Sequence, residues 1–225
     1  MHVTLEISID PALAGRVRLG ALALDEVAVR DTDAALQAEA DAYAEQLRHR
    51  YGGVKSAEVP GAAEARALYK ALGLDPTKIR PSNEALLRRV LKGEGLPTVN
   101  TLVDALNLCS LRYQLPFGLY DADRIRPPVL LRRGAAGEGY EGIRKSLVSV
   151  AERPVLADAE GPFGNPSSDS SRTMVTVETK RALVVVYAPA MLSNARLDEV
   201  LDGTESTLTR FCDGRRSGRW LLPPN

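Results

Sequence analysis

Two stretches near the N-terminus alternate between apolar and polar side chains, which is the pattern of a half-buried β-strand. The first runs from Val3 to Ile9 and is ended by Pro11, and the second runs from Val17 to Ala23. Near the other end of the chain, the stretch from Ala182 to Tyr187 is continuously apolar. We therefore expect that stretch to form a strand in the middle of a sheet, buried on both faces.

Helical signals dominate the middle of the chain. Several expected helices begin at an N-cap residue, such as Asp31 or Asp33 and Ser82, or carry a proline in the first turn, such as Pro60. Glycines often end them. These signals predict helices from position 31 or 33 to 50, and over residues 60–72, 82–92, 98–113 and 194–211.

Short apolar runs return in the second half and predict strands over residues 129–131, 146–151, 155–158 and 173–177. Residues 161–171 are rich in Gly, Pro, Ser and Asp, which predicts an irregular loop. Helices in the middle and strands at both ends favour an α+β fold over regular alternation. We expect a single domain over residues 1–214 and a basic tail over 215–225 that is free to move.

Composition allows a sizeable core but gives no general affinity for nucleic acid. The 225 residues suffice for one large domain or two small ones, and 44% of them are hydrophobic. The 29 basic and 29 acidic side chains cancel, whereas proteins that coat nucleic acid non-specifically are strongly basic. Any contact with nucleic acid must therefore come from a local patch of basic residues.

The sequence argues against several classes of chemistry. The spacing of the two cysteines and two histidines does not match a metal site, a disulfide framework or a His-based triad; these residues are Cys109, Cys212, His2 and His49. Glycine motifs for phosphate or dinucleotide binding and the Gly-x-Ser-x-Gly elbow are missing. We expect no metal and no organic cofactor. Without a leader pattern or a run long enough to span a bilayer, we expect a cytoplasmic protein with no membrane partner.

A polar stripe marks the helix expected over residues 98–113. Asn100, Asp104 and Asn107 lie at positions i, i+4 and i+7, so they share one face of an otherwise apolar helix. A buried amide or carboxylate needs a hydrogen-bond partner, because leaving it without one is costly. The partner is either a ligand or the protein itself, with Asn100 capping the helix and Asp104 bracing a loop. From the residues alone, both interpretations stay open.

Two further segments contain candidate site residues. Gly118 lets backbone approach a ligand closely in the turn expected after the helix, and Tyr120 offers a flat face and a hydroxyl. The residues from Asp169 to Thr173 join small hydroxyls, a carboxylate and a guanidinium, which can line a polar pocket. The alternatives are a loop with Tyr120 in the core and an ordinary serine-rich turn.

Basic side chains form three clusters along the sequence. The clusters contain Arg88, Arg89 and Lys92; Arg124, Arg126, Arg132 and Arg133; and Arg215, Arg216 and Arg219. Each is typical of a solvated surface, yet clusters that flank the polar segment can also bind phosphates without reading a base sequence.

Several of these segments together resemble a known family. Four segments are similar to the tRNA-binding and editing domain of the phenylalanyl-tRNA synthetase beta subunit: Arg80–Leu91, Leu96–Pro97, Asn100–Asn107 and Leu115–Ile125. More closely, they and the segments Asp169–Thr173 and Val177–Lys180 resemble the stand-alone proteins that carry only this domain. The strong match covers residues 80–126, with a weaker likeness through residue 187.

The resemblance implies a mixed fold with a β-sandwich-like core and helices packed around it. It also implies a pocket for the 3′-terminal adenosine of tRNA and its attached amino acid. The implied activity is trans-editing, in which mischarged aminoacyl-tRNA is deacylated, with canavanyl-tRNA(Arg) or another non-cognate aminoacyl-tRNA as substrate. The implied partners are tRNA and, transiently, an aminoacyl-tRNA synthetase. A non-catalytic tRNA-binding module and an amino-acid sensor on the same fold remain alternatives.

The resemblance also assigns residue roles. Asp104 and Asn107 align with the Asp and Asn of the synthetase motif, whereas Gly118 stands where that motif has a histidine. An activated ester needs an oriented water and a stabilised oxyanion, which Asn107 and backbone amides near Gly118 can supply. Asp104, Asp169 or Glu178 can select a cationic side chain. The expected substrate-binding residues are Asn100, Asp104, Ser110, Tyr120, Asp121, Asp169, Ser171, Arg172, Thr173 and Glu178, and the expected phosphate-binding residues are Arg88, Arg89, Lys92 and Arg124.

Overall fold

The computed structural model describes residues 5–144 and 146–223. His2, the start of the expected first strand at Val3 and the last two residues of the expected tail lie outside the described residues. The helices are α1 (Ala34–Tyr51), α2 (Ala62–Ala71), α3 (Ser82–Leu91), α4 (Thr101–Tyr113) and α5 (Asn194–Cys212). The strands are β1 (Ile7–Ile9), β2 (Val17–Asp25), β3 (Phe117–Asp121), β4 (Val129–Arg133), β5 (Gly139–Glu141), β6 (Leu147–Ser149), β7 (Pro154–Asp158), β8 (Gly161–Asn165), β9 (Ser168–Asp169), β10 (Ala182–Pro189) and β11 (Arg215–Leu222).

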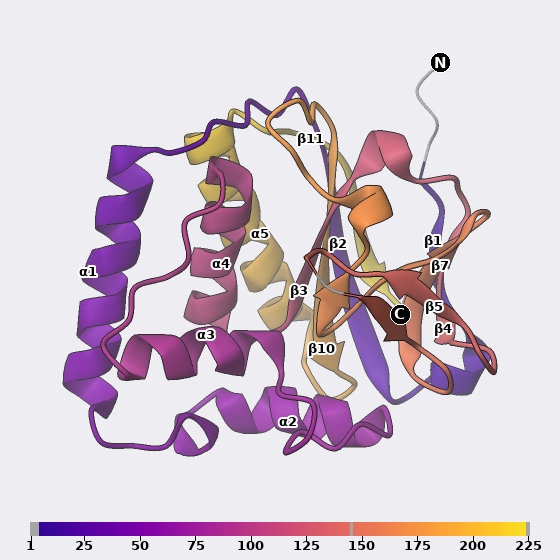
Figure 1. Cartoon of the computed structure of the whole chain (residues 1–225), viewed down its shortest axis with the longest axis horizontal. Helices are drawn as coiled ribbons and strands as arrows, with labels where there is room; N and C mark the ends of the chain where they lie inside the picture. The colour runs from indigo at the N-terminus through magenta and orange to yellow at the C-terminus, as the bar shows by residue number, and fades with distance from the viewer. Residues whose placement is uncertain (1–4, 145, 224–225) are drawn as a thin grey trace.

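The strands form two packed sheets, with α1, α3, α4 and α5 on one side and α2 packed against the core between the sheets. One sheet has the order β11-β2-β10-β3 and the other has the order β1-β4-β7-β8-β9, while β5 and β6 form a separate hairpin. In Figure 1 the helices α1, α3, α4 and α5 occupy one half of the molecule and the sheets occupy the other half. The expected α+β class, with a sandwich-like core and helices packed around it, is confirmed.

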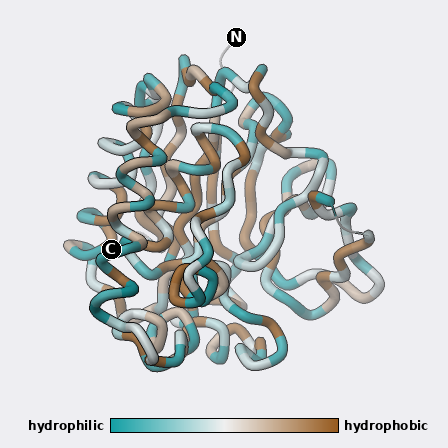
Figure 2. The backbone as a smooth tube through the Cα atoms, turned by 60° about the vertical axis from the view of Figure 1, so that its left-hand side comes forward, coloured by the Kyte–Doolittle hydropathy of each residue, from teal (hydrophilic) through white to brown (hydrophobic). Residues whose placement is uncertain are grey.

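Strand β10 is buried on both faces of the four-stranded sheet. Val184 and Val186 pack with residues of α4 and α5, whereas Leu183, Val185 and Tyr187 pack with the five-stranded sheet. All eight residues of β10 are buried, and the strand lies between β2 and β3. The expected central position of this apolar run is confirmed. Figure 2 shows the hydrophobic stretches of the chain running through its interior.

Side-chain caps fix the starts of three helices. The carboxylate of Asp33 accepts a hydrogen bond from Leu36 N, and Asn100 accepts one from Val103 N. Ser193 caps α5 in the same way. Such caps satisfy backbone N–H groups that have no partner within the helix. The expected cap at Ser82 is wrong, because Ser82 is already helical and Pro81 occupies the cap position of α3.

Four segments differ from the sequence-based expectation. Residues 117–121 form β3 instead of a turn, and the expected loop over 161–171 contains β8 and β9. The expected strand over 173–177 is absent, and a short 3₁₀ turn over Ser171–Thr173 precedes an extended segment. Residues 215–222 form β11, which pairs antiparallel with β2, so the prediction of a mobile tail is wrong there. These strands depend on their partner strands, which local composition does not reveal.

No helix in the described part of the chain is long and apolar enough to cross a lipid bilayer.

Candidate functional site

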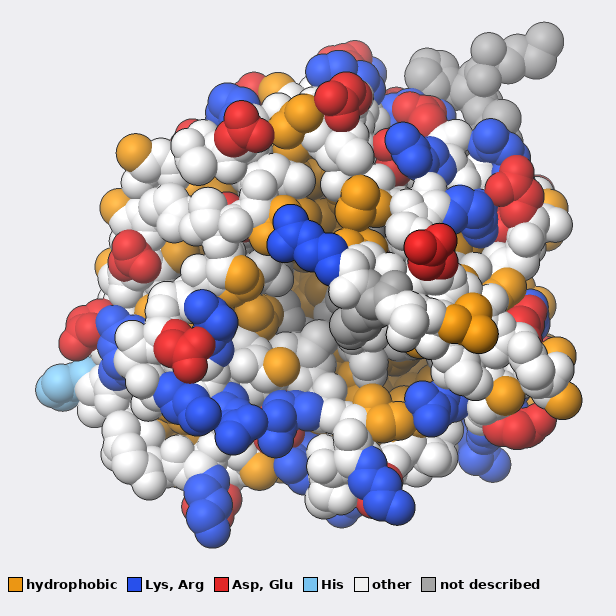
Figure 3. All heavy atoms as spheres, in the orientation of Figure 1, with side chains coloured by type: hydrophobic (Ala, Val, Ile, Leu, Met, Phe, Trp, Pro, Cys, Tyr) orange, Lys and Arg blue, Asp and Glu red, His pale blue; other side chains and the backbone are white. Residues whose placement is uncertain are grey.

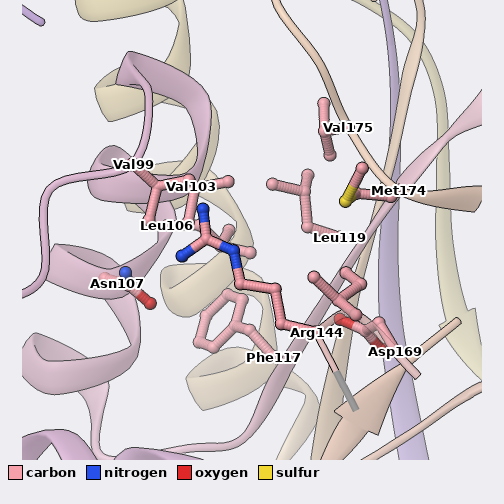
Figure 4. A pocket seen from close by; sticks show the side chains of 11 residues that line it. Val99, Val103, Leu106, Asn107, Phe117, Leu119, Arg144, Asp169, Met174 and Val175 are labelled. Atoms are coloured by element: carbon pink, nitrogen blue, oxygen red, sulfur yellow. The ribbon is translucent and has the colours of Figure 1, made fainter. Parts of the chain in front are cut away.

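An apolar cavity lies between α4, β3 and two loops. Its volume is about 260 Å³. Two segments that lie far apart in the sequence complete it: the loop between β5 and β6, and the residues after the 3₁₀ turn. The lining residues are Val99, Val103, Leu106, Asn107, Phe117, Leu119, Ile143, Arg144, Asp169, Met174 and Val175. Figure 4 shows these side chains around the space, with the Arg144 side chain extending across it.

A second cavity of about 230 Å³ adjoins the first. Leu106, Asn107 and Phe117 line both cavities, so the two spaces meet at these side chains. The second cavity is more polar. Its other lining residues are Arg80, Ser82, Ala85, Leu86, Ser110 and Ser167. The site therefore combines an apolar chamber and a polar chamber with the Asn107 amide between them.

An open basic groove along α3 continues from the second cavity. It shares Arg80, Ala85 and Leu86 with that cavity and adds Arg88, Arg89, Lys92 and Glu94. Figure 3 shows Lys and Arg side chains gathered over α3, below a hollow that has hydrophobic side chains on its walls. Three of the four expected phosphate-binding residues, Arg88, Arg89 and Lys92, thus lie in this groove. The fourth, Arg124, lies elsewhere, with its Nε 3.7 Å from the Asp121 carboxylate.

The polar stripe of α4 divides into two residues that bind other described parts of the protein and one, Asn107, that does not. Asn100 caps the helix, and Asp104 accepts hydrogen bonds from Val99 N at 2.9 Å and from Gln37 Nε2 at 3.2 Å. Burial raises the pKa of Asp104 above its ordinary value, although the Val99 N–H opposes this rise. The half-buried Asn107 makes no side-chain hydrogen bond to any other residue that the structure describes. The two interpretations of the stripe therefore both apply, to different residues.

Gly118 and Tyr120 face away from both cavities, contrary to expectation. Successive residues of a strand point to opposite faces, so Phe117 and Leu119 line the cavity and their neighbours face the sandwich. A Cβ atom on Gly118 would lie 2.2 Å from the hydroxyl oxygen of Tyr120. Tyr120 is fully buried, and its hydroxyl is 3.2 Å from that of Tyr187. Gly118 makes room for Tyr120 rather than for a ligand.

Most of the other expected substrate-binding residues hold the protein together. Asp121 accepts hydrogen bonds from Thr179 Oγ1 and Asp123 N, and Arg172 forms ion pairs with Asp158 and Glu160. The remaining three lie outside the cavity lining. Ser171 donates to the carbonyl oxygen of Glu141, Thr173 is fully buried, and Glu178 is exposed beside Thr176.

Asp169 and Ser110 are the expected substrate-binding residues that do line a cavity. Asp169 lies in the apolar chamber, where it is one of two charged residues, with Arg144. Burial raises the pKa of the nearby Tyr120 phenol, and the negative charge of Asp169 adds to this rise. The Ser110 hydroxyl lines the polar chamber and donates to the carbonyl oxygen of Leu115 at 2.7 Å.

Sequence reasoning missed several lining residues. Arg80, Ser82, Arg144 and Met174 are examples, and they come from three separate segments. The alternation of Phe117 and Leu119 was a usable signal, but it lies in a segment expected to be a turn. Over the described residues, no group of three or more His, Cys, Asp and Glu side chains is placed to hold a metal ion.

Comparison with known proteins relates most of the chain to one family. The B3/4 domain family matches residues 64–210, which include every lining residue of both cavities. The uncharacterized protein YhzB of Bacillus subtilis is 20% identical over 221 residues, which span 98% of this chain and 100% of YhzB.

Shorter similarities connect the chain to synthetases. The phenylalanine–tRNA ligase beta subunits of Rickettsia felis and Carboxydothermus hydrogenoformans are each 32% identical, over 94 and 99 residues. These matches cover 40% and 42% of this chain but only 11% and 12% of the ligase subunits.

A solved structure shares the fold. It is an N-terminal fragment of the phenylalanyl-tRNA synthetase beta subunit from Pyrococcus horikoshii, with a TM-score of 0.50 and 13% identity. The similarity covers 99% of this chain and 55% of the fragment, so the chain spans about half of the fragment's length.

Proposed function

Because the chain belongs to the B3/4 domain family, we propose that it hydrolyses the ester bond that joins a wrongly attached amino acid to tRNA. This hydrolysis is compatible with the fold that the chain shares with the synthetase fragment. The family match covers the whole of the two-chamber site.

One observation supports the proposal above the others: the Asn107 amide lies where the apolar and polar chambers meet. An aminoacyl ester has the matching division, with an amino-acid side chain on one side of the carbonyl and a ribose and base on the other. With the side chain in the apolar chamber and the nucleoside in the polar one, the ester carbonyl lies near Asn107. The basic groove along α3 then faces the RNA strand.

The chemistry requires little of the protein, because an aminoacyl ester is already activated toward water. A donor aimed at the developing oxyanion stabilises the transition state, and a fixed ester and water reduce the entropic barrier. The Asn107 side chain has two N–H donors and one oxygen acceptor, so it can stabilise the oxyanion or orient the water. We assign no role to Gly118, because the space beside its Cα is filled by Tyr120.

The walls of the apolar chamber favour an uncharged amino-acid side chain. Eight of the eleven lining residues are hydrophobic, and of the three carboxylates considered for selecting a cation, Asp169 alone belongs to the lining. A guanidinium or its canavanine analogue would lose hydration against these walls, which is costly without several compensating hydrogen bonds. We therefore rank apolar aminoacyl esters above canavanyl-tRNA(Arg) as substrates.

A deacylation assay tests the proposal. Wild-type protein is incubated with tRNAs that carry leucine, methionine, tyrosine, arginine or canavanine, and release of the amino acid is followed. We expect hydrolysis of at least one ester whose amino-acid side chain is uncharged. In Asn107→Ala the rate of this hydrolysis should fall by about 100-fold or more, the typical effect of removing an oxyanion donor. Asn100→Ala is the control for a weakened α4, since Asn100 caps that helix and lies outside both cavities, so it should lower stability and keep hydrolysis.

The alternatives predict other outcomes. Binding of tRNA with no hydrolysis of any ester would replace the proposal with a non-catalytic tRNA-binding module. Binding of a free amino acid with neither tRNA binding nor hydrolysis would indicate a sensor. Faster release of canavanine or arginine than of every uncharged amino acid would contradict the ranking of substrates and leave the reaction in place.

A further inference from the structure

Arg80 occupies a special position in the site. It is a residue of both the polar chamber and the basic groove, and its side chain is 39% exposed. We infer that Arg80 binds the phosphate that joins the acylated nucleotide to the preceding nucleotide of the RNA strand. This inference rests on the proposed function, and it assigns the path that the strand takes away from the site.

The order of the three spaces carries the inference. Asn107 is the polar residue that lines both chambers, and Arg80 is the charged residue that lines both the polar chamber and the groove. A strand whose terminal nucleoside fills the polar chamber has its first internucleotide phosphate at that second junction. A guanidinium suits this place, because it forms paired, charge-assisted hydrogen bonds with phosphate oxygens.

The surrounding charges hold Arg80 in place and leave it able to bind an anion. Its Nε is 3.6 Å from Glu84 Oε1, which is longer than a hydrogen bond. Glu84 is buried, and its nearer partner is Arg66, whose Nε lies 2.8 Å from Glu84 Oε2. One carboxylate thus faces two guanidinium groups, and its closest contact is with Arg66. The excess positive charge lies at the junction of chamber and groove.

A second feature of the polar chamber also points to a polar ligand. The hydroxyl oxygen of Ser82 is buried and has no hydrogen-bond partner among the described residues. Ser82 lines the same chamber as Arg80, two residues further along the chain. A buried hydroxyl without a partner is costly, and a sugar or phosphate oxygen in the chamber would satisfy it.

Beyond Arg80, the groove continues the positive charge. Arg88 lies on α3 and Lys92 is the C-cap residue four positions later, so both exposed side chains lie on the same side of the helix. Arg89 is more constrained, since it donates to the Gly95 carbonyl and pairs with Glu94. The following phosphates of the strand therefore meet Arg88 and Lys92, and the RNA leaves the site along α3.

The test compares substrates with and without the bridging phosphate. The fastest ester from the deacylation panel is prepared both on adenosine and on the trinucleotide CCA. Arg80→Gln is expected to lower kcat/KM for the trinucleotide ester by on the order of 10- to 100-fold, the range for a hydrogen bond to a charged group. Hydrolysis of the adenosine ester should fall at least several-fold less than that of the trinucleotide ester, because the adenosine ester has no phosphate for Arg80 to bind. Arg196→Gln is the control, since Arg196 pairs with Glu199 on α5 and its side chain is 41% exposed.

Binding of uncharged tRNA gives a second readout that does not need hydrolysis. Loss of one phosphate contact reduces the slope of log K against log salt by about 0.7 to 0.9. We expect this reduction in Arg80→Gln and an unchanged slope in Arg196→Gln. An unchanged slope in Arg80→Gln, or an equal loss of activity on the adenosine and trinucleotide esters, would overturn the inference alone. Wild-type protein that neither binds tRNA nor hydrolyses an ester would overturn the proposed function as well.

Discussion

Gly118→Ala tests the assignment of Gly118 to the core. The added Cβ would lie 2.2 Å from Tyr120 Oη and 2.7 Å from Cζ, so something must move. Tyr120 has little freedom, because it is fully buried and its ring lies edge-on to Phe163. On another side, Gly164 is so close that a Cβ there would lie 2.3 Å from the same hydroxyl. Neither the ring nor its neighbours can yield without disturbing the packing of both sheets.

Overpacking a core generally lowers the free energy of unfolding by about 1–3 kcal/mol. The rigid surroundings of Tyr120 place this substitution near the upper end of that range. Replacing glycine also reduces the entropy of the unfolded chain, which opposes the loss by about 0.4–1 kcal/mol. We therefore expect Gly118→Ala to lower the free energy of unfolding by about 2 kcal/mol and Tm by roughly 4–8 °C.

Urea unfolding followed by circular dichroism measures this loss, and a double-mutant cycle locates its source. Tyr120→Phe removes Oη, the nearest atom, and costs about 1 kcal/mol through the lost contact with Tyr187. In that background Gly118→Ala should be less harmful, with a coupling of at least about 0.5 kcal/mol. Full stability of Gly118→Ala together with lost ester hydrolysis would refute the reasoning and return Gly118 to the site.

Three further substitutions probe other parts of the structure. Asn100→Ala removes the cap of α4 and should cost about 1 kcal/mol in urea unfolding, whereas wild-type stability would show that the cap is dispensable. Glu84→Ala leaves the half-buried Arg66 without its carboxylate and should cost about 2–4 kcal/mol, and a loss below about 0.5 kcal/mol would contradict this. Hydrogen bonds from Arg132 lower the pKa of Glu138 below its ordinary value of 4.5. The ion pair therefore stabilises the folded protein above pH 4.5, and this stabilisation is lost as the pH falls through the pKa of Glu138 in the folded state. The stability difference between wild type and Glu138→Gln should therefore shrink below pH 4.5, and a difference that is constant from pH 7 to pH 3 would count against the ion pair.

The sequence predicted elements whose signals are local. Asp33, one of two candidates, caps α1, and Asn100 caps α4, which was one of the two interpretations left open. The uninterrupted apolar run of β10 indicated its central position. Strands β8 and β11 were missed because Gly, Pro and Arg weaken their local preference, and the strands beside them decide their conformation.

The part of the site that could be predicted from the sequence is the part formed by single helices. The polar stripe of α4 pointed to Asn107, and the cluster at Arg88 pointed to the basic groove. The stripe could not show that Asp104 satisfies the backbone of a loop, because that depends on how the chain approaches the helix. Arg144 and Met174 reach the cavity only through tertiary folding.

Strand β3 serves the cavity on one face and the sandwich on the other, which limits how the preference for an amino acid can diversify. Enlarging or shrinking Phe117 or Leu119 would shift a strand whose far side is filled by the Tyr120 ring. Val103 and Met174 are half-buried at the cavity and carry no such constraint. Natural variants and laboratory libraries that alter selectivity while keeping the protein folded should therefore concentrate their changes at these two positions.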